Sequence, residues 1–545
     1  MPTVRSVTYD LLRSLGMTTI FGNPGSTEEP FLEGFPADFR YVLGLQEATV
    51  VGMADGFAQA TGRAAFVNLH TAPGVGFAMG NVIAAWANRA PLVLTAGQQT
   101  RQMLGMEPWL LNREAVELPK PYVKWSNEPV RAEDVPAAIE RAYHAAMQQP
   151  AGPAFVSIPM DDWDAAAEPH RARDVSHRTA PDPAALDRLA ERVAAAGRPL
   201  LVTGAGVDIC DGWDATVALA ELLNAPVWAA PAPERVGFPQ THPLFQGFLP
   251  MAKGPLAERI GPHDLVLVIG APVFRYYPYV PGPVAPPGTE IVMLTEDPAE
   301  AARAPLADAV VGDVGLAAEG LLARLAGMPP GDRPEPPRRP GPAAAAPSEP
   351  ITPAWALRAL AQTMPPGTTL VEEAASNRLT FFDQIRLDEP GRFFATGSGG
   401  LGYAMPAAVG AQIARPGGQV VCVIGDGAAM FSPQALWTAA REHAPVVFLI
   451  LNNGQYAILK AFAAFGEHGD RVPGLDLPGL DFAGLARSLG CRGARVTAGD
   501  ALVPALREAF DVAARDRAPT LLDVVLEPTV PDIFKGLKAV AGARA

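Results

Sequence analysis

A carboxylate and an amide side chain follow two apolar segments in the last third of the chain, at the points where those segments end. One segment runs into Gly425-Asp426-Gly427, and about two dozen residues later another runs into Asn452-Asn453. The carboxyl ends of adjacent parallel strands face one crevice, so these side chains are expected to meet there. Their oxygens are hard donors that suit Mg²⁺ or Ca²⁺. The pair therefore predicts a divalent cation that neutralises the charge of a bound diphosphate.

Two other interpretations of this segment stay open on the residues alone. Glycine, aspartate and asparagine are common in ordinary turns, which need no ligand. In addition, residues 397–402 read GSGGLG and fit the GxGxxG pattern of dinucleotide sites, with Asp426 as the acid that would bind a ribose. A nicotinamide or flavin site would leave Asn452 and Asn453 without a function. It would also need no Mg²⁺, so metal dependence separates the two kinds of site.

Three more side chains with catalytic potential lie near the ends of candidate strands in the first part of the chain. Ser26 lies in the Gly/Pro turn after the first strand, His70 follows a strand at 65–69, and Glu47 begins a helix after a short strand at 41–45. Taken singly, each is explained by a turn hydroxyl, a locally satisfied histidine or an acid favoured by a helix dipole. Taken together, they predict one crevice that holds an acid, a hydroxyl and an imidazole.

The elements that must position these residues alternate along the whole chain. Short, almost wholly apolar runs, typical of strands buried on both faces of a parallel sheet, are followed by Ala- and Leu-rich helical patterns. The alternation predicts an α/β protein with three doubly wound parallel-sheet domains. Besides the short strand at 41–45, strands are expected at residues 19–21, 65–69, 92–96, 154–158, 200–203, 265–269, 290–294, 369–371, 420–424, 446–451 and 520–524.

Two polar, proline-containing stretches, residues 170–183 and 328–353, divide the chain. Such stretches are typical of connections between domains, and a chain of 545 residues is too long for one hydrophobic core. We therefore expect domains at 1–180, 181–330 and 351–528, a linker at 331–350 and a C-terminal tail at 529–545.

The composition excludes several classes of partner. The chain carries 43 basic and 57 acidic residues, a net charge of −14, without a basic stripe, which argues against nucleic acid. No apolar run is long enough to span a bilayer, and the amphipathic first segment lacks the apolar centre of a signal peptide. We expect a cytoplasmic protein with no membrane partner. The three cysteines Cys210, Cys422 and Cys491 are far apart, as is typical of reduced thiols.

These motifs resemble those of the thiamine-diphosphate-dependent 2-oxo acid decarboxylases, and of the benzoylformate decarboxylase family in particular. The resemblance covers nearly the whole chain in order, and it is carried by runs such as FGNPGSTEEPFL, LQEATVVGMADGFAQAT, NLHTAPGVGFAMG, VIGAPVFRY, GGLGYAMPAA, VIGDG and LNNGQY. It implies thiamine diphosphate with Mg²⁺ or Ca²⁺ as cofactors. It also names the three domains: pyrimidine-binding, middle and diphosphate-binding.

The implied reaction is the non-oxidative decarboxylation of a 2-oxo acid, with benzoylformate going to benzaldehyde and CO₂ as the leading pair. It would pass through an ylide and an enamine of the cofactor, with carboligation of aldehydes as a side reaction. The resemblance further implies a homodimer in which the glutamate domain of one chain faces the diphosphate domain of the other, and a homotetramer built from two such dimers.

The resemblance also implies the metal ligands and the activating acid. Asp426, Asn453 and the backbone carbonyl of Gln455 would bind the metal. Glu47 would share a proton with N1′ of the cofactor's pyrimidine, which lets the cofactor's own imine remove the proton from C2. A carboxylic acid in a largely apolar pocket suits this exchange, because burial favours the protonated form.

The remaining site residues follow from the same resemblance. Ser26 would hold the substrate carboxylate, and His70 would relay protons to and from the carbonyl-derived oxygen. Leu401 would lie between the two cofactor rings, and the carbonyl of Gly399 would accept a hydrogen bond from the 4′-amino group. The other residues implied to lie at the cofactor are Asn23, Pro24, Gly25, Glu373, Ser376, Gly425, Gly427 and Tyr456.

The substrate end departs from the family pattern. Tyr277 stands where the family has a second active-site histidine, and a phenol with a pKa near ~10 is a poorer proton shuttle at neutral pH. Ile458 replaces a smaller alanine, whereas Ala375 replaces a threonine. Leu459 and Phe462 keep the pocket apolar. Two alternatives therefore remain: a thiamine-dependent decarboxylase, carboligase or lyase for another 2-oxo acid or an acyloin, and a non-catalytic nucleotide-binding protein on the same scaffold.

Overall fold

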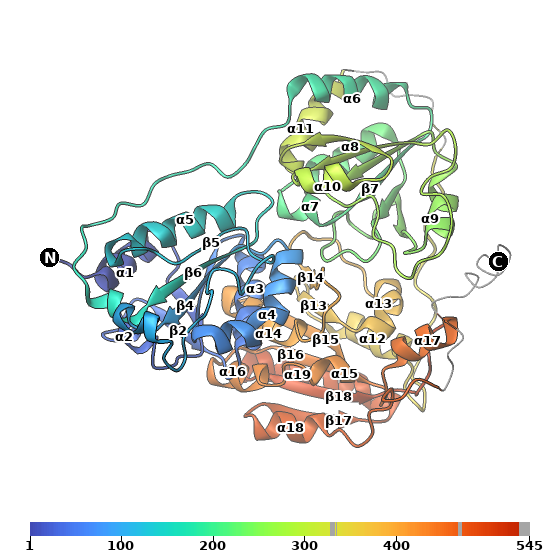
Figure 1. The fold of residues 1–545 in the computed structure, drawn as a ribbon. Helices are drawn as coiled ribbons and strands as arrows, with labels where there is room; N and C mark the ends of the chain where they lie inside the picture. Colours follow the sequence, from blue (N-terminus) through green and yellow to red (C-terminus); the bar gives the residue numbers. More distant parts are fainter. Residues whose placement is uncertain (328–332, 334, 467–470, 533–545) are drawn as a thin grey trace.

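The structure is a computed structural model that describes residues 1–327, 333, 335–466 and 471–532. Three six-stranded sheets organise these residues, and all strand pairs within them are parallel. Helices flank each sheet, and the three units follow one another along the chain (Figure 1). The predicted α/β fold with three parallel sheets is confirmed.

The first unit has the strand order β2-β1-β3-β4-β6-β5. Its strands are β1 (Thr19–Gly22), β2 (Arg40–Leu43), β3 (Ala65–Leu69), β4 (Leu92–Gln98), β5 (Ser126–Asn127) and β6 (Pro153–Pro159). Its helices are α1 (Val4–Leu15), α2 (Glu29–Leu32), α3 (Glu47–Thr61), α4 (Thr71–Ala87) and α5 (Val135–Met147), with the 3-10 helices η1 (Arg101–Met106), η2 (Ala132–Asp134) and η3 (Met160–Asp164).

The middle unit has the order β12-β11-β10-β7-β8-β9. Residues 167–182, which form no helix or strand, lead into it from the first unit (Figure 1). Its strands are β7 (Pro199–Thr203), β8 (Val227–Ala229), β9 (Phe245–Phe248), β10 (Leu265–Ile269), β11 (Glu290–Thr295) and β12 (Ala307–Val311). Its helices are α6 (Pro183–Ala195), α7 (Ala205–Ile209), α8 (Trp213–Leu223), α9 (Lys253–Ile260), α10 (Pro298–Arg303) and α11 (Val314–Leu325).

The third unit has the order β14-β13-β15-β16-β18-β17. Its strands are β13 (Thr369–Glu373), β14 (Phe393–Ala395), β15 (Val420–Gly425), β16 (Val447–Asn452), β17 (Arg492–Val496) and β18 (Thr520–Val525). Its helices are α12 (Pro353–Thr363), α13 (Arg378–Gln384), α14 (Ala404–Ala414), α15 (Asp426–Ala429), α16 (Ala435–Arg441), α17 (Ala457–Phe465), α18 (Phe482–Ser488) and α19 (Leu502–Asp516), with η4 (Ala375–Asn377) and η6 (Gly499–Ala501).

The domain bounds expected from the sequence stay a prediction. Residues 335–350 of the expected linker form no helix or strand. Of the expected tail, residues 533–545 lie outside the described residues. Within the described part of the chain, no helix is both long enough and apolar enough to cross a membrane.

The first and third units of the same chain share one hydrophobic core. Helices α3 and α14 lie against each other at its centre, and glycines allow their backbones to touch. A Cβ at Gly56 would overlap the backbone carbonyl of Ala407, and one at Gly410 would overlap the carbonyl of Met53. This packing fixes α3, whose first residue is Glu47, relative to the start of α14.

Local signals in the sequence explain where α3 begins and ends. The Gln46 side chain accepts a hydrogen bond from the Thr49 amide at 3.0 Å and so caps the first turn. Gly62, with φ 67°, ends the helix in the left-handed conformation that glycine adopts readily. Glu47 is therefore held in the first turn of a helix that is mostly buried.

Candidate active site

Asp426 and Asn453 follow the neighbouring parallel strands β15 and β16, as the sequence predicts. The Asp426 carboxylate accepts hydrogen bonds from the backbone amides of Gly427, at 2.8 Å, and Gly454, at 2.7 Å. Burial raises the pKa of Asp426, although these backbone bonds act to lower it. No basic side chain of the described residues pairs with this acid. A bound cation could therefore neutralise the buried negative charge of Asp426.

The donor atoms around Asp426 fit a small divalent ion. The Asn453 side-chain oxygen accepts from the Gln455 amide at 3.2 Å, which folds residues 453–455 back toward the end of β16. Nowhere in the described parts of the chain do three or more His, Cys, Asp or Glu side chains form a cluster that could hold a metal. A carboxylate, an amide oxygen and a backbone carbonyl would together leave positions for diphosphate oxygens.

The neighbouring Asn452 has a different partner, although the two asparagines are adjacent in the sequence. Its amide donates to the buried carboxylate of Asp523 on β18 at 2.8 Å. It therefore ties two strands together inside the sheet and is not a candidate ligand.

Glu373, the last residue of β13, holds the loop that precedes α14. Its carboxylate accepts from the backbone amides of Gly402, Tyr403 and Ala404 at 2.7, 2.8 and 2.6 Å. Burial raises its pKa to about 7. Both of its oxygens accept backbone hydrogen bonds, so Glu373 holds the loop before α14 by its backbone.

The loop held by Glu373 carries two predicted cofactor residues. Gly399 has φ 73° and no neighbour within 4 Å of a Cβ built there, so its backbone is open to a ligand. Leu401 is 37% exposed. A leucine on a loop fixed at its base can present its side chain to a ligand without a large entropic cost.

Asn81 of α4, which the sequence does not single out, connects this loop to the Glu47 helix. Its side-chain amide donates to the carbonyl of Ala48 at 2.6 Å and to that of Gly402 at 3.2 Å. The first turn of α3 and the loop before α14 therefore lie within reach of one side chain in the same chain.

The predicted residues of the first unit lie together around the start of α4. A Cβ at Gly74 would lie 3.5 Å from Cγ of Glu47 and 3.5 Å from Cβ of His70, so both side chains contact this glycine position. The Asn23 amide donates to Glu47 Oε1 at 3.1 Å. Ser26 is exposed on the adjacent turn.

A buried acid, Glu28, orients His70, and the sequence motifs do not reveal it. Its Oε2 lies 2.8 Å from His70 Nδ1, and its two oxygens also accept from the amides of Gly25, at 3.0 Å, and Gly97, at 2.9 Å. Thr27 donates to it at 2.7 Å. The hydrogen bond from Glu28 raises the pKa of His70, although burial acts to lower it.

Gly25 permits this arrangement, because a Cβ there would overlap the His70 ring. The sequence pattern singles out this turn for the hydroxyl of Ser26, and not for the carboxylate of Glu28. The only signal was a second carboxylate three residues after Gly25, in a turn that is already rich in polar residues.

Four of the predicted substrate residues belong to two elements of the third unit: Ala375 lies in η4, and Ile458, Leu459 and Phe462 lie in α17. The Ser376 hydroxyl accepts from the Ile458 amide at 3.0 Å, so η4 caps the start of α17. Ala375 and Leu459 are exposed beside this contact. Tyr277 comes from the middle unit, and its ring lies 4.9 Å from that of Phe462 on α17. The structure thus joins the residue that departs from the family pattern to the predicted pocket wall.

Tyr456, another predicted cofactor residue, lies against the GDG segment. A Cβ at Gly427 would overlap the Tyr456 ring, so only glycine lets this ring approach. Pro24 is exposed, whereas Gly425 has open space around it. The placement of these residues at a bound cofactor stays a prediction.

Comparison with known proteins identifies the family. Models of the thiamine pyrophosphate enzymes match the chain in three parts: the N-terminal binding domain at residues 2–117, the central domain at 186–321 and the C-terminal binding domain at 374–524. Each part falls within one of the three units, although β5 and β6 of the first sheet and β13 of the third lie outside the matched residues.

Individual relatives match nearly the whole chain. Benzoylformate decarboxylase of Pseudomonas aeruginosa is 46% identical over 97% of this chain and 100% of its own. The crystal structure of benzoylformate decarboxylase from Polynucleobacter necessarius is 42% identical, with a TM-score of 0.94 and coverage of 97% and 100%. That of the Rhodococcus jostii thiamine-diphosphate-dependent 4-hydroxybenzoylformate decarboxylase is 44% identical, with a TM-score of 0.93 and the same coverage.

Sheets, motifs and relatives agree along the length of the chain, from the Glu47 helix to the GDG and NN segment. The protein therefore belongs to the thiamine pyrophosphate enzyme family, as a thiamine-diphosphate-dependent 2-oxo acid decarboxylase.

Proposed function

We propose that this enzyme converts benzoylformate to benzaldehyde and CO₂. The observation that carries the proposal is the grouping of Glu47, His70 and the Ser26 turn at the start of α4, in a chain whose relatives include benzoylformate and 4-hydroxybenzoylformate decarboxylases. Thiamine diphosphate, when bound, supplies a nucleophilic carbon and takes up the electron pair that departing CO₂ leaves. The residues of the chain bind, orient and protonate.

Asp426, Asn453 and the carbonyl of Gln455 would hold Mg²⁺ or Ca²⁺, whose charge would offset that of a diphosphate. Support comes from the buried Asp426 carboxylate, which lacks a basic partner in the described structure. A divalent ion would supply the missing positive charge, and oxygen donors are the ones it prefers. Gly425 and Gly427 leave the adjacent backbone close to the diphosphate.

Glu47 shares a proton with the pyrimidine nitrogen. Its side chain is 8% exposed, and within the described structure only Oε1 accepts a hydrogen bond, from Asn23. Oε2 is therefore available to a ligand. A buried acid held by one amide in the first turn of a helix has a fixed direction, which proton exchange at one ring atom requires.

His70 holds and returns the substrate proton. Glu28 accepts a hydrogen bond from Nδ1–H, which leaves Nε2 as the nitrogen that faces the substrate. The raised pKa of His70 favours the protonated ring, which can donate. The exposed hydroxyl of Ser26, one turn away, is suited to hold the substrate carboxylate, and the phenol of Tyr277 is suited to donate a hydrogen bond at the pocket mouth.

A second candidate is decarboxylation or cleavage of a different 2-oxo acid or acyloin. Tyr277 favours it, because a phenol replaces the family's second histidine and packs on Phe462 at 4.9 Å. Ile458 adds bulk on the same wall. Both changes act on the part of the site that selects the substrate and leave the cofactor residues unchanged.

The active enzyme is proposed to be a homodimer, with two dimers forming a tetramer. Large apolar side chains near the cofactor loops are exposed in the single chain: Phe77 is 65%, Phe431 53% and Met430 43% exposed. Phe431 also lies against Gly402 at the base of the Leu401 loop. Exposed apolar groups beside a site are typical of surfaces that a second subunit covers.

A panel of 2-oxo acids, assayed with thiamine diphosphate and Mg²⁺, tests the substrate. Benzoylformate and its ring-substituted analogues should give the highest kcat/KM, and linear 2-oxo acids should give much lower values. Turnover of a linear acid with benzoylformate untouched would show that the named substrate is wrong and would favour the second candidate.

Glu47→Gln tests the activating acid. It should lower CO₂ release by ~10² or more, because general acid–base catalysis contributes about that much. Binding of thiamine diphosphate with Mg²⁺, measured by calorimetry, should stay within a few-fold of the wild type. The matched control is Glu29→Gln, an exposed acid of α2, which should change neither quantity. Full activity in Glu47→Gln would contradict the assigned role.

A further inference from the structure

A loop of the middle unit, residues 230–236, lies where the three units meet. The Arg378 side chain of α13 donates to the carbonyl of Pro233 at 2.7 Å, and the Ala395 amide of β14 donates to the carbonyl of Glu234 at 2.9 Å. Both bonds tie the loop to the third unit through its backbone. We call residues 230–236 the junction loop.

The junction loop is also tied to the first unit. Arg235 donates to the carbonyl of Gln59 in α3 at 2.8 Å, and it forms an ion pair with Asp208 at 3.2 Å. Arg235 is only 6% exposed. The backbone of Glu234 is therefore held from both sides, and its side chain starts from a fixed point.

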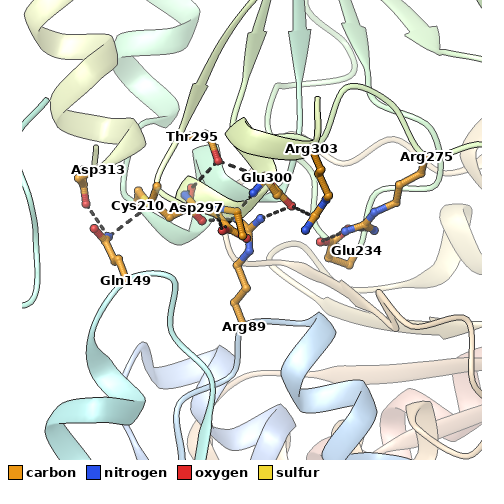
Figure 2. A network of polar contacts seen from close by, with 12 residues as sticks. Arg89, Gln149, Cys210, Glu234, Arg275, Thr295, Asp297, Glu300, Arg303 and Asp313 are labelled. Atoms are coloured by element: carbon orange, nitrogen blue, oxygen red, sulfur yellow. Dashed lines mark hydrogen bonds and ion pairs between the residues drawn. The ribbon is translucent and has the colours of Figure 1, made fainter. Parts of the chain in front are cut away.

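The Glu234 side chain holds Arg275, which lies in the loop after β10. Its two oxygens accept from the two terminal nitrogens of the guanidinium at 2.8 and 3.1 Å, as Figure 2 shows. Burial acts to raise the pKa of Glu234, but the charges of Arg275 and Arg89 outweigh it and hold the pKa below its ordinary value. The pair is thus a charged, two-point contact, the geometry that restricts an arginine most.

Arg275 directly precedes the aromatic pair Tyr276 and Tyr277, so the contact fixes the backbone next to Tyr277. The Tyr277 amide donates to the carbonyl of Met251 at 3.0 Å, and its ring packs on Phe462. A continuous set of contacts therefore runs from Glu234 through Arg275 to the wall of the predicted substrate pocket.

Arg89, at the end of α4, closes the other side of this network. It pairs with Glu296 of the middle unit. It also pairs with Glu300 of the same unit at 2.7 Å, as Figure 2 shows. The cavity between Arg89, Glu234 and Arg275 encloses only about 10 Å³, room for one water at most. The Glu234–Arg275 contact is therefore closely enclosed on this side.

We propose that Glu234 is a positioning residue, which holds Arg275 so that Tyr277 stays against Phe462 and shapes the pocket wall that an aromatic 2-oxo acid packs against. The inference rests on the proposed function, because it assigns Tyr277 to the substrate pocket. It adds a residue of the middle unit that touches neither substrate nor cofactor and acts through the loop that carries Tyr277.

Glu234→Gln tests the proposal, with Glu296→Gln as the matched control. Both changes neutralise a buried acid that forms an ion pair with an arginine, but of the two only Glu234 pairs with an arginine of the Tyr277 loop. In Glu234→Gln, the ratio of kcat/KM for benzoylformate to that for 2-oxobutanoate should fall roughly ten-fold, through KM for benzoylformate, as expected for a misplaced pocket wall. In Glu296→Gln, the ratio should stay within about two-fold.

Hydrogen exchange supplies a readout that does not depend on turnover. The amides of residues 271–280 should exchange faster in Glu234→Gln than in the wild type, and they should keep the wild-type rate in Glu296→Gln. If Glu234→Gln fails to fold, Arg275→Lys takes its place. This variant keeps the charge but loses the two-point contact, and it should show the changes in the ratio and in exchange expected of Glu234→Gln.

Two results would overturn the proposal. One is an equal change of the ratio or of the exchange rate in the Glu234 and Glu296 variants. The other is an effect of Glu234→Gln that persists in a Tyr277→Ala background, because a residue that acts through Tyr277 must lose its effect there. Failure of the wild type to use benzoylformate would instead count against the proposed function, and the exchange experiment would still decide the role of Glu234.

Discussion

The chemistry of the first unit depends on one buried acid beside one half-buried imidazole. Glu28 accepts from Nδ1–H of His70 and from two backbone amides, so its position does not depend on the histidine. The pair therefore fixes the direction of the ring and leaves Nε2 as the nitrogen for the proposed substrate. A turn of small residues brings the acid there, and Gly25 leaves the space for the ring.

Glu28→Gln should move the alkaline limb of the kcat/KM profile to lower pH. The hydrogen bond from Glu28 raises the pKa of His70, so its loss lets the ring deprotonate at lower pH. Glu29→Gln, on the neighbouring exposed acid, should leave the profile in place. An alkaline limb at the same pH in both variants would contradict the assigned pair.

The same pair has a consequence for stability. Because the folded-state pKa of His70 is raised above its unfolded value, its contribution is complete below the ordinary histidine pKa and is lost as pH rises through the raised value. The difference in Tm between the wild type and Glu28→Gln should therefore shrink as pH rises across this window. Thermal melts at a series of pH values measure it, and a difference that grows with pH would be the wrong sign.

At the scale of elements, the packing of α3 on α14 positions the Glu47 end of the site. Gly56→Ala would place a methyl group against the backbone carbonyl of Ala407, which cannot rotate away. Overpacking of this kind costs about 1–3 kcal/mol. Gly417→Ala is the control, because a Cβ there meets nothing within 4 Å. Denaturant unfolding should show the loss only for Gly56→Ala, and equal midpoints in the two variants would argue against close helix contact.

The central strands could be predicted because burial on both faces leaves a continuous apolar run. β10 and β16 are buried at every residue, and each predicted strand lies within about two residues of its observed bounds. The strands that the sequence did not indicate are β5, β8, β9, β12, β14 and β17, and all except β8 lie at sheet edges. Residues of β12 and β17 are mostly exposed, so no apolar run marks them.

The candidate site follows the same division. Asp426 and Asn453 follow neighbouring strands of the third sheet, and Glu47 and His70 follow strands of the first, so the strand order within each sheet places each pair. The residues that the sequence did not reveal act through partners far along the chain: Asn81 bonds to Gly402, and Glu28 bonds to Gly97. A single sequence contains no local pattern for such pairs, because the fold alone creates them.

At the scale of the whole molecule, the contact between the first and third units differs in kind from the contacts that the middle unit makes with them. The first and third units share one apolar core, whereas the middle unit has clusters of its own. Among the described residues, it contributes only Trp213 and Val236 as buried members of a cluster of the third unit, and it contacts the first unit through buried ion pairs such as Arg89–Glu296. Buried ion pairs demand a defined geometry. The middle unit is therefore suited to hold a loop, such as that of Tyr277, in one place beside α17 of the third unit.

Removal of the metal tests how the proposed cofactor site contributes to the stability of the whole chain. A ligand that binds only the folded state stabilises it by RT ln(1 + [L]/Kd), about 2.7 kcal/mol at 100 times Kd. Thiamine diphosphate with Mg²⁺ should therefore raise Tm by several degrees, and EDTA should abolish the rise. Asp426→Asn should remove it as well, because the variant loses the carboxylate whose buried charge has no basic partner in the described structure. The control is Asp511→Asn, an exposed acid of α19 in the same unit, which should keep the full rise. An increase in Tm that survives EDTA, or that Asp426→Asn retains, would mean that the diphosphate is held without a metal at this strand end.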